Sequence, residues 1–534
     1  MTSKTKILLI LWQVILPILS GFCKSPLPYL QNDGNTIRLI VDNKPFLMLA
    51  GEIGNSSAFP DYLHPHWPKL AALNLNTLLT PVYWETIEPT EGQFDFGLVD
   101  GLIADARKAN IRLVLLWFGS WKNCMSCYVP SWVKIDPQRF PRAQDKTGRG
   151  MEILSPFSRA NLEADARAFA ALMRHLRQID GAAHTVIMVQ VENEVGMIPD
   201  SRDRSAVAES LFHSQVPAEL LNHLQQKKEQ LHPKLRQAWA AGGYRTSGIW
   251  PEVFGADPFT DDLFMAWHLA RYIDQVAERG KAEYPLPMFV NAALIRPGYQ
   301  PGQYASGGPL PHSMDIWKAA APHIDFLAPD IYFGDVADWT AQYRRPDNPL
   351  FIPEIQAGPN NGVQALYAVG EHRTLGFSPF GIESIDAETR TALADAYGLL
   401  APMAPFILEQ YPDAESYGLL SKGPEQRRPQ RLLAGDFVLH VEYDREGWER
   451  CGGLLWVLSR DEFLVAGAGL TITFESAGAE DERAGILWAQ EVRFVDGAPQ
   501  PIRRLNGDQT HQGRHIRLEP GRMSAQRFRL YKYR

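Results

Sequence analysis

The segment VQVENEVG (189–196) ends an apolar run with two carboxylates separated by an amide. Burying unpaired charge costs more free energy than one short strand can return, so we expect Glu192, Asn193 and Glu194 to open into a site. A second apolar run, NPLFIPEIQAG (348–358), delivers Glu354 in the same way. Two strand-end carboxylates that face each other across a pocket are the groups that glycosidic-bond hydrolysis requires.

The elements that would position these residues follow a repeating pattern of apolar strand, loop and helix between about residues 46 and 385. The strands are predicted at Phe46–Ala50, Asn76–Thr80, Arg112–Phe118, Val186–Val191, Met288–Asn291, Phe326–Ala328, Leu350–Pro353 and Phe377–Ile382. Helical spacing of apolar residues is found at His66–Leu73, Gly97–Ala109, Arg159–Gln178, Asp262–Arg279 and Ser313–Ala320. Eight such units predict an α/β fold, a (β/α)8 TIM barrel, whose strands converge at their C-terminal ends and bring Glu194 and Glu354 together.

The pattern changes in the last part of the chain. Helix-like Thr389–Glu409 is followed by segments of alternating polarity, at Phe437–Glu442, Gly453–Ser459, Gly469–Glu475, Gln490–Val495 and His515–Leu518. We therefore expect a barrel at 35–390, a connecting helix at 391–412 and an antiparallel β-sandwich-like domain at 413–534 that supports the barrel or binds carbohydrate. Two stretches rich in Gly, Pro, Asp and Ser, 198–214 and 295–310, are predicted as long loops on the active face.

The N-terminus has the layout of a secretory signal peptide. Lys4 and Lys6 precede the apolar run 7–19, and small residues follow it. The run is short for a membrane span, so we expect a cleaved leader at 1–23 and an exported protein, periplasmic or secreted; an uncleaved anchor is the alternative. Phe22 directly before Cys23 is a poor fit to a lipid-attachment site.

Composition and cysteine usage limit the classes of function further. The chain of 534 residues is 45% hydrophobic, and its net charge of −8 gives no electrostatic reason to expect nucleic acid. Cys124 and Cys127 form a C-x-x-C that would be either a loop disulfide or two inert thiols. Zinc would need two further ligands, and neither a second C-x-x-C nor a paired-histidine motif is present in the sequence.

Three sequence blocks in this order resemble glycoside hydrolase family 35, the β-galactosidase family within the clan of retaining (β/α)8 enzymes. They are VYWETIEP (82–89) followed by GQFDF (92–96), QVENE (190–194), and the NPL (348–350) strand leading to Glu354. The resemblance covers about 35–390. It implies that Glu194 is the acid/base, that Glu354 is the nucleophile and that Asn193 contacts the 2-hydroxyl. It also implies that Tyr332 hydrogen-bonds the nucleophile or the sugar, and that no metal or organic cofactor is required.

The chain departs from the lysosomal type of that family. GSW (119–121) stands where that type has Ala-Glu-Trp, Val195 replaces the tyrosine after the Asn-Glu pair, and IQ (355–356) replaces the aromatic after the nucleophile. The chain is therefore closer to a bacterial branch whose members remove terminal galactose from xyloglucan side chains.

Further candidates end or follow other strands. Glu52, at the end of the first strand, and Glu383, after the eighth, are expected to bind sugar hydroxyls, and a salt-bridged strand end is the alternative for Glu52. Three tryptophans are candidates for stacking on a sugar face, with a place in the core as the alternative: Trp84, Trp121 and Trp267. Glu192 points away from Asn193 and is expected to be ion-paired scaffold.

These patterns predict a retaining exo-β-galactosidase that acts on a β-galactoside, with no stable membrane span in the mature protein. Two alternatives remain open from the sequence. One is the same machinery acting on another glycone, such as an arabinoside or a glucoside. The other is a carbohydrate-binding barrel without catalysis. The oligomeric state is not predicted.

Overall fold

The structure is a computed structural model that describes residues 26–34, 36–409, 414–426 and 428–534. The predicted signal peptide at 1–23 lies outside these residues. The described chain begins with a three-stranded antiparallel sheet of β1 (Tyr29–Asn32), β2 (Ile37–Val41) and β3 (Lys44–Phe46). This sheet leads directly into the first barrel strand.

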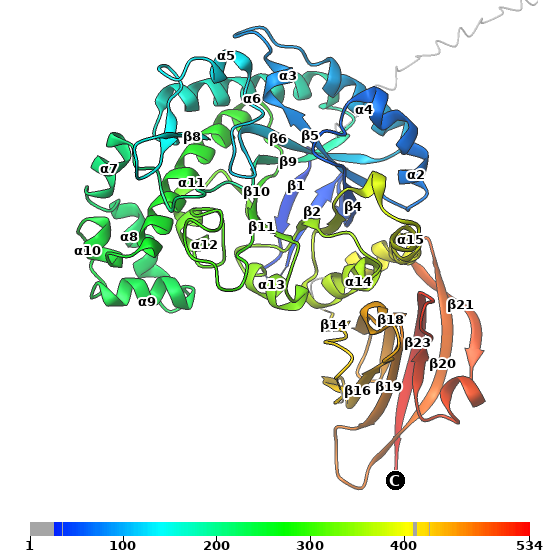
Figure 1. The fold of residues 1–534 in the computed structure, drawn as a ribbon. Coiled ribbons are helices and arrows are strands. Elements are labelled where there is room, and N and C mark those ends of the chain that lie inside the picture. The colour runs from blue at the N-terminus through cyan, green and yellow to red at the C-terminus, as the bar shows by residue number, and fades with distance from the viewer. Residues whose placement is uncertain (1–25, 35, 410–413, 427) are drawn as a thin grey trace, which may run out of the picture.

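Eight parallel strands close into a barrel, which confirms the predicted fold class (Figure 1). In chain order they are β4 (Met48–Glu52), β5 (Thr77–Tyr83), β6 (Arg112–Lys122), β9 (Val186–Asn193), β10 (Met288–Ala293), β11 (Phe326–Ile331), β12 (Ile352–Ile355) and β13 (Gly376–Pro379). Each predicted strand overlaps one of them. The eighth ends earlier than predicted, because Gly381 at φ +66° turns the chain into a short 3-10 helix at Ile382–Ser384.

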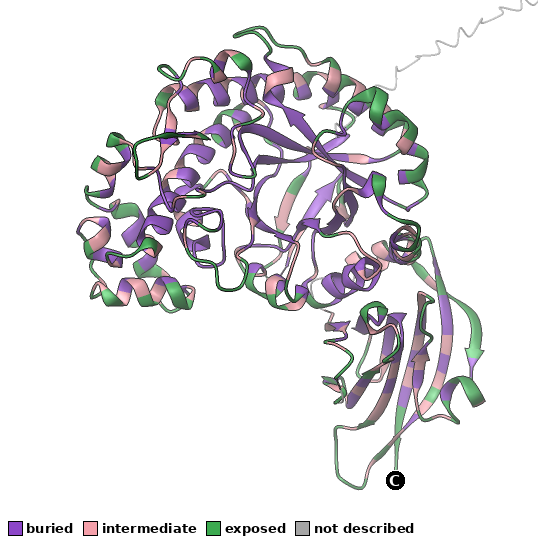
Figure 2. Ribbon diagram, in the orientation of Figure 1, coloured by how far each residue is buried: buried purple, intermediate pink, exposed green. Residues whose placement is uncertain are grey.

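The barrel strands are buried along almost their whole length, because helices cover them (Figure 2). This double burial explains the near-continuous apolar runs in the sequence. Near the start of three strands the aromatic rings of Phe289, Phe326 and Phe351 pack together, with centroids of the first two 5.2 Å apart.

Helices surround the barrel (Figure 1). They are α1 (Pro60–Leu63), α2 (Trp67–Ala71), α3 (Trp84–Ile87), α4 (Gly97–Ala109), α5 (Ser131–Lys134), α6 (Arg159–Asp180), α11 (Pro258–Glu283), α12 (Met314–Ala320), α13 (Val336–Tyr343) and α14 (Asn361–His372). A hairpin of β7 (Arg142–Gln144) and β8 (Gly150–Leu154) lies in the loop after β6. Helix α14 was not predicted from the sequence; it is buried on nearly every side, between the barrel and strands of the C-terminal region.

A group of four helices is inserted between β9 and α11 (Figure 1). They are α7 (Ala206–Phe212), α8 (Ala218–Gln226), α9 (Pro233–Ala241) and α10 (Trp250–Phe254). The prediction of 198–214 as loop throughout was therefore wrong, because Ser205 caps α7 by accepting a hydrogen bond from the Ala208 backbone. The two long segments after β9 and β10 are joined by backbone hydrogen bonds of 2.8 and 3.0 Å between Met197 and Ser306. These hydrogen bonds tie the two segments to each other.

The C-terminal region begins with α15 (Ala387–Glu409) and continues as two antiparallel sheets, as predicted (Figure 1). One sheet has the order β14 (Ser416–Leu420), β17 (Gly452–Val457), β18 (Glu462–Ala468), β23 (Ser524–Tyr533), β20 (Arg483–Val495) and β21 (Ala498–Leu505). The other has the order β15 (Gln430–Ala434), β16 (Phe437–Tyr443), β19 (Leu470–Ser476) and β22 (Ile516–Leu518). Leu439, Val465 and Phe528 belong to a core shared by the two sheets. Edge strand β21 escaped detection because it is mostly exposed and carries two prolines.

Within the described residues, α15 is the one helix long and apolar enough to cross a membrane by length and composition. Its buried residues Leu393, Tyr397 and Leu400 belong to the main hydrophobic core. Core helices of soluble proteins pass the same test, so this feature is weak evidence for a membrane span.

Candidate active site

The C-terminal ends of the barrel strands bring several ionisable and amide side chains together. Glu52 ends β4, Lys122 ends β6 and Asn193 ends β9, directly before Glu194. On the opposite side, Asp330 in β11 is the register partner of Glu354 in β12. One carboxylate oxygen from each of Glu194, Asp330 and Glu354 lies within 4.8 Å of the other two. The structure thus brings Glu194 and Glu354 together although 160 positions separate them (354 − 194).

Three hydrogen-bond donors converge on the carboxylate of Glu354. The Tyr332 hydroxyl donates to Oε2 at 2.7 Å. The side-chain amides of Asn193 and Asn291 donate to Oε1 at 3.2 and 3.4 Å. Donors favour the ionised form of a carboxyl group, so this arrangement suits Glu354 as the anion of the site. Burial in first place, and the charge of Glu354 in second, raise the pKa of Tyr332 and keep its hydroxyl a donor.

Glu194 is held differently, by a tight turn at residues 122–125. Backbone hydrogen bonds join Lys122 and Met125 in both directions, and both central residues have positive φ, Asn123 at 48° and Cys124 at 67°. Positive φ at both central residues is characteristic of a type I′ turn, which reverses the chain direction within two residues. It aims the Asn123 amide at Glu194 Oε2 and the Cys124 backbone N–H at the Glu194 carbonyl, 3.1 Å away. Glu194 itself has φ of 45°, a strained value for a residue with a side chain.

Burial and neighbouring charge set the protonation of Glu194. Burial in first place, and the charge of Glu354 in second, raise the pKa of Glu194 to about 7. Burial in first place, and the charge of Glu354 in second, also raise the pKa values of Glu52 and Asp330 well above their ordinary range. A protonated Glu194 beside a hydrogen-bonded, ionised Glu354 is the division of roles that acid-assisted bond cleavage needs.

The raised pKa of Glu194 predicts that the Glu194→Gln variant is more stable than the wild type at pH 8. Above pH 7 the folded protein must hold a buried charge that glutamine lacks, whereas below about pH 4.5 the carboxyl is protonated in both the folded and unfolded states. The gain should approach about 3 kcal/mol at pH 8 and vanish near pH 4. Thermal unfolding of both proteins at the two pH values measures it; an equal difference at both would contradict the assigned pKa.

Carboxylate oxygens at this spacing also suit a divalent cation in principle. The residues present do not fit one well. Glu354 already accepts hydrogen bonds from Tyr332, Asn193 and Asn291, and the ammonium of Lys122 supplies positive charge to the same carboxylates.

Glu52 and Glu383 lie near the same strand ends. Glu52 is fully buried, and neither of its carboxylate oxygens has a hydrogen-bond partner within the described residues. It is therefore not a salt-bridged strand end. Glu383 Oε1 accepts from the Ser57 hydroxyl at 2.6 Å and from the Gly54 backbone at 3.0 Å, while its Oε2 is buried without a partner among the residues described. Bare buried carboxylate oxygens are acceptors that a ligand's hydroxyls can satisfy.

The three tryptophans proposed to stack on a sugar belong to the core instead. Trp84, Trp121 and Trp267 are 0%, 1% and 3% exposed, because each packs within the main hydrophobic cluster. The Trp84 indole donates to Glu88 at 2.9 Å, and the Trp121 indole donates to the Leu154 carbonyl. This burial favours the alternative for all three tryptophans, a place in the core.

Glu192 is scaffold, but the expected ion pair is absent among the described residues. Its carboxylate accepts from the backbone N–H groups of Ser120 and Trp121 at 3.1 and 2.7 Å. Burial, with Asp165 nearby, raises the pKa of Glu192. Backbone donors on β6 therefore replace the cation that the sequence led us to expect.

Four site residues were missed by the sequence analysis: Lys122, Asn123, Asn291 and Asp330. Asp330 and Asn291 each end an apolar run at the same edge as Glu354, so the strand-end rule that identified Glu194 applied to them as well. Lys122 and Asn123 had no such signal, because β6 extends past its predicted end at Phe118 through the irregular pairing between Trp117 and Lys122.

Cys124 and Cys127 are free thiols. Cys124 is buried, with its Sγ 3.3 Å from the Glu194 carbonyl, and Cys127 is exposed. Of the two alternatives that the sequence left open, the structure shows the reduced form.

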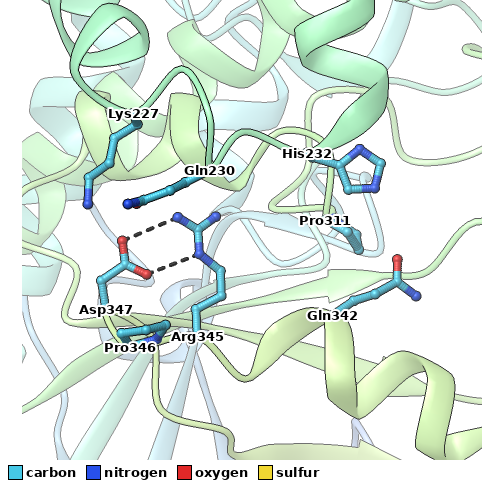
Figure 3. Close-up of a pocket in the computed structure, with 8 residues that line it drawn as sticks. All are labelled: Lys227, Gln230, His232, Pro311, Gln342, Arg345, Pro346 and Asp347. Atoms are coloured by element: carbon cyan, nitrogen blue, oxygen red, sulfur yellow. Dashed lines mark hydrogen bonds and ion pairs between the residues drawn. The ribbon is translucent and has the colours of Figure 1, made fainter. Parts of the chain in front are cut away.

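Two of the cavities among the described residues lie beside elements of the barrel. One, of about 310 Å³, is lined by Tyr332, Phe333 and Gln356 and so opens beside Glu354. The other, of about 520 Å³, lies between the inserted helices and the segment before β12 (Figure 3). Arg345, which lines the second cavity, is already paired with Asp347 and Asp315. None of the predicted site residues lines this larger cavity.

The fold and the carboxylate pair define a (β/α)8 barrel with hydrolase-like geometry, and comparisons with known proteins agree with that class. Residues 67–241 match the model of glycoside hydrolase family 42, described as β-galactosidase. This range includes Glu194 but stops before Glu354. Residues 393–517 match DUF5597, a domain of unknown function. The match does not support the resemblance to family 35, and β-galactosidase is what the two assignments share.

Individual relatives are distant. A β-galactosidase of Xanthomonas manihotis is 30% identical over 168 residues, which are 30% of this chain and 26% of that protein. The chain thus matches about a quarter of that relative's length. A cold-adapted β-galactosidase from Rahnella sp. R3 is 15% identical with a TM-score of 0.44, over 67% of this chain and 56% of that one. The enzyme from Halorubrum lacusprofundi is 15% identical with a TM-score of 0.45, over 66% and 58%.

Proposed function

We propose that this protein is a retaining exo-β-galactosidase that removes terminal β-D-galactosyl residues from oligosaccharides or polysaccharide side chains. The observation that carries the proposal is the approach of Glu194 and Glu354, with carboxylate oxygens within 4.8 Å of each other. Retaining glycosidases hold their two carboxyl groups about 5–5.5 Å apart, whereas inverting enzymes leave room for a water molecule between them. The choice of galactose is supported by the family match over 67–241.

We assign Glu354 as the nucleophile and Glu194 as the acid/base of a double displacement. The ionised carboxylate of Glu354 attacks the anomeric carbon while the bond to the leaving oxygen breaks and Glu194 gives its proton to that oxygen. In the second step Glu194, now a carboxylate, takes a proton from water. The water oxygen bonds to the anomeric carbon and the bond to Glu354 breaks. Tyr332, Asn193 and Asn291 hold Glu354 in place throughout.

Deep burial of the reacting groups supports action at a chain end. Glu194 and Glu354 are 6% and 2% exposed. A polysaccharide bound along its length would require a more open cleft, whereas a terminal residue fits a closed pocket. Xyloglucan side chains are the substrate we propose to test first, and export through the predicted leader would place the enzyme where such polymers occur.

The proposed function is tested by the sugar released and by its configuration. We expect 4-nitrophenyl β-galactoside to be the best of a panel of nitrophenyl glycosides, and proton NMR to show β-galactose as the first-formed product. Faster turnover of an arabinoside or glucoside would overturn the galactose assignment. First-formed α-galactose would overturn retention, and no hydrolysis of any glycoside would leave a binding barrel. Galactosylated xyloglucan oligosaccharides compared with lactose then define the aglycone.

Glu52 is expected to bind a hydroxyl of the galactosyl group, so Glu52→Gln should lower kcat/KM about 10- to 100-fold. The reason is that its bare buried carboxylate has no other partner among the described residues. Glu85→Gln is the matched control, because Glu85 is a half-exposed partner of Lys134 outside the pocket. The loss should disappear with the deoxygalactoside that lacks the contacted hydroxyl. If Glu52→Gln matched wild type on every substrate, Glu52 would not contact the sugar.

A further inference from the structure

Lys122 is a buried cation that the mechanism above does not use. It is the last residue of β6 and the register partner of Asn193 on β9, and it is 4% exposed. Its ammonium donates to Asn193 Oδ1 at 2.8 Å and lies 5.1 Å from the centroid of the Phe118 ring. Within the described residues it forms no direct ion pair with a carboxylate. Burying an ammonium without such a pair costs free energy, so the presence of Lys122 at this position needs a physical reason.

The contact with Asn193 determines which way the amide faces. An ammonium has only donors, so it can be satisfied by the amide oxygen and not by the NH2 group. With the oxygen committed to Lys122, the NH2 group points to Glu354 Oε1 at 3.2 Å. A reversed amide would place its NH2 against the ammonium and its oxygen against the Glu354 carboxylate.

Lys122 also supplies positive charge to four buried carboxyl groups, which come from different strands of the barrel. They are Glu52 on β4, Glu194 after β9, Asp330 on β11 and Glu354 on β12. Burial alone would lower the pKa of Lys122, but these four groups outweigh it and raise that pKa. In return, Lys122 opposes the rise in the pKa values of Glu52, Glu194 and Asp330.

We propose that Lys122 is a positioning and charge-balancing residue of the reaction, which orients Asn193 toward Glu354 and supplies positive charge to the four buried carboxyl groups. The proposal rests on the glycosidase function proposed above. It predicts that both the geometry and the charge of Lys122 contribute, which three substitutions can separate. Lys122→Met removes both, Lys122→Gln keeps a donor for Asn193 without charge, and Lys122→Arg keeps the charge in another shape.

The kinetic test is the pH dependence of kcat/KM with 4-nitrophenyl β-galactoside. We expect Lys122→Met to lower kcat/KM about 100-fold or more, mainly through kcat, because the nucleophile loses an oriented donor. The alkaline limb of the profile, which we assign to Glu194, should move to higher pH in Lys122→Met and Lys122→Gln, because removing a cation raises the pKa of a nearby carboxyl group. Lys122→Arg should keep the wild-type limb. Less than a threefold loss in Lys122→Met, or an alkaline limb that does not move, would overturn the proposal.

A second readout needs no turnover. Without Lys122 the buried carboxyls must ionise unbalanced, so the difference in unfolding midpoint between wild type and Lys122→Met should grow from pH 5 to pH 8. Lys281→Met is the control, since Lys281 on α11 is a half-buried lysine that pairs with Asp325 at 2.7 Å, directly before β11 and so at the opposite end of that strand from the site. A difference that stays constant with pH would refute charge balancing. An inactive wild type with a growing difference would refute the glycosidase function alone.

Discussion

Replacing Glu354 by alanine is expected to lower kcat on aryl β-galactosides by about 10⁴-fold or more, because it removes the group that forms the new bond to the anomeric carbon. Folding should be retained, since glycosidase carboxylates are held for reaction rather than for stability, and Glu354 forms no ion pair among the described residues. Steady-state kinetics with circular dichroism measures both.

Azide separates loss of the nucleophile from general damage to the pocket. It should fit the space vacated in Glu354→Ala, attack the anomeric carbon from the face that Glu354 occupied, and give α-galactosyl azide. Restored turnover with that product would identify the missing group as the nucleophile. A well-folded Glu354→Ala protein with wild-type kcat would remove Glu354 from the mechanism. Glu85→Ala, on the half-exposed ion pair with Lys134, is the control.

Replacing Glu194 by alanine should have an effect that depends on the leaving group. Lactose needs protonation of its leaving oxygen, so kcat/KM should fall about 10³- to 10⁴-fold, within the range for loss of a general acid. A dinitrophenyl galactoside leaves without a proton and should lose far less. Azide should now attack the covalent intermediate and give β-galactosyl azide, the opposite anomer from Glu354→Ala. Equal losses on both substrates would contradict the acid role.

The pH profile gives the same assignment independently. Because burial and Glu354 raise the pKa of Glu194 to about 7, wild-type kcat/KM should fall as pH rises through 7 and the acid loses its proton. That limb should be missing in Glu194→Ala. A limb that persists unchanged in the variant would assign the titration to another group, such as Asp330.

The sequence predicted the barrel well because its strands are buried on both faces and its longest helices are amphipathic. Helix Gly97–Ala109 has the predicted bounds, since its apolar residues recur on one face and Asn110 in a left-handed conformation ends it. Two of the elements that were not predicted, α14 and β21, lie at the two extremes of burial. Helix α14 is buried almost all round, and β21 is exposed almost throughout.

For the site, strand ends that carry charge predicted Glu52, Glu194 and Glu354 but could not supply their surroundings. The turn that aims Asn123 at Glu194 depends on positive φ at two residues that are not glycine. The prediction that the three tryptophans stack on a sugar was weak for a different reason. A large ring with one polar atom suits a sugar face and a hydrophobic core equally, and only packing distinguishes the two.

Covalent trapping tests the central claim most directly. Incubation with 2-deoxy-2-fluoro-β-galactosyl fluoride, which slows hydrolysis of the intermediate more than its formation, should add one fluorogalactosyl group per chain. Peptide mass spectrometry should locate that group on Glu354, and the label should be absent from Glu354→Ala. A labelled Asp330 or Glu194, or an active enzyme that never acquires the label, would contradict the assignment of Glu354 as the nucleophile of a retaining glycosidase.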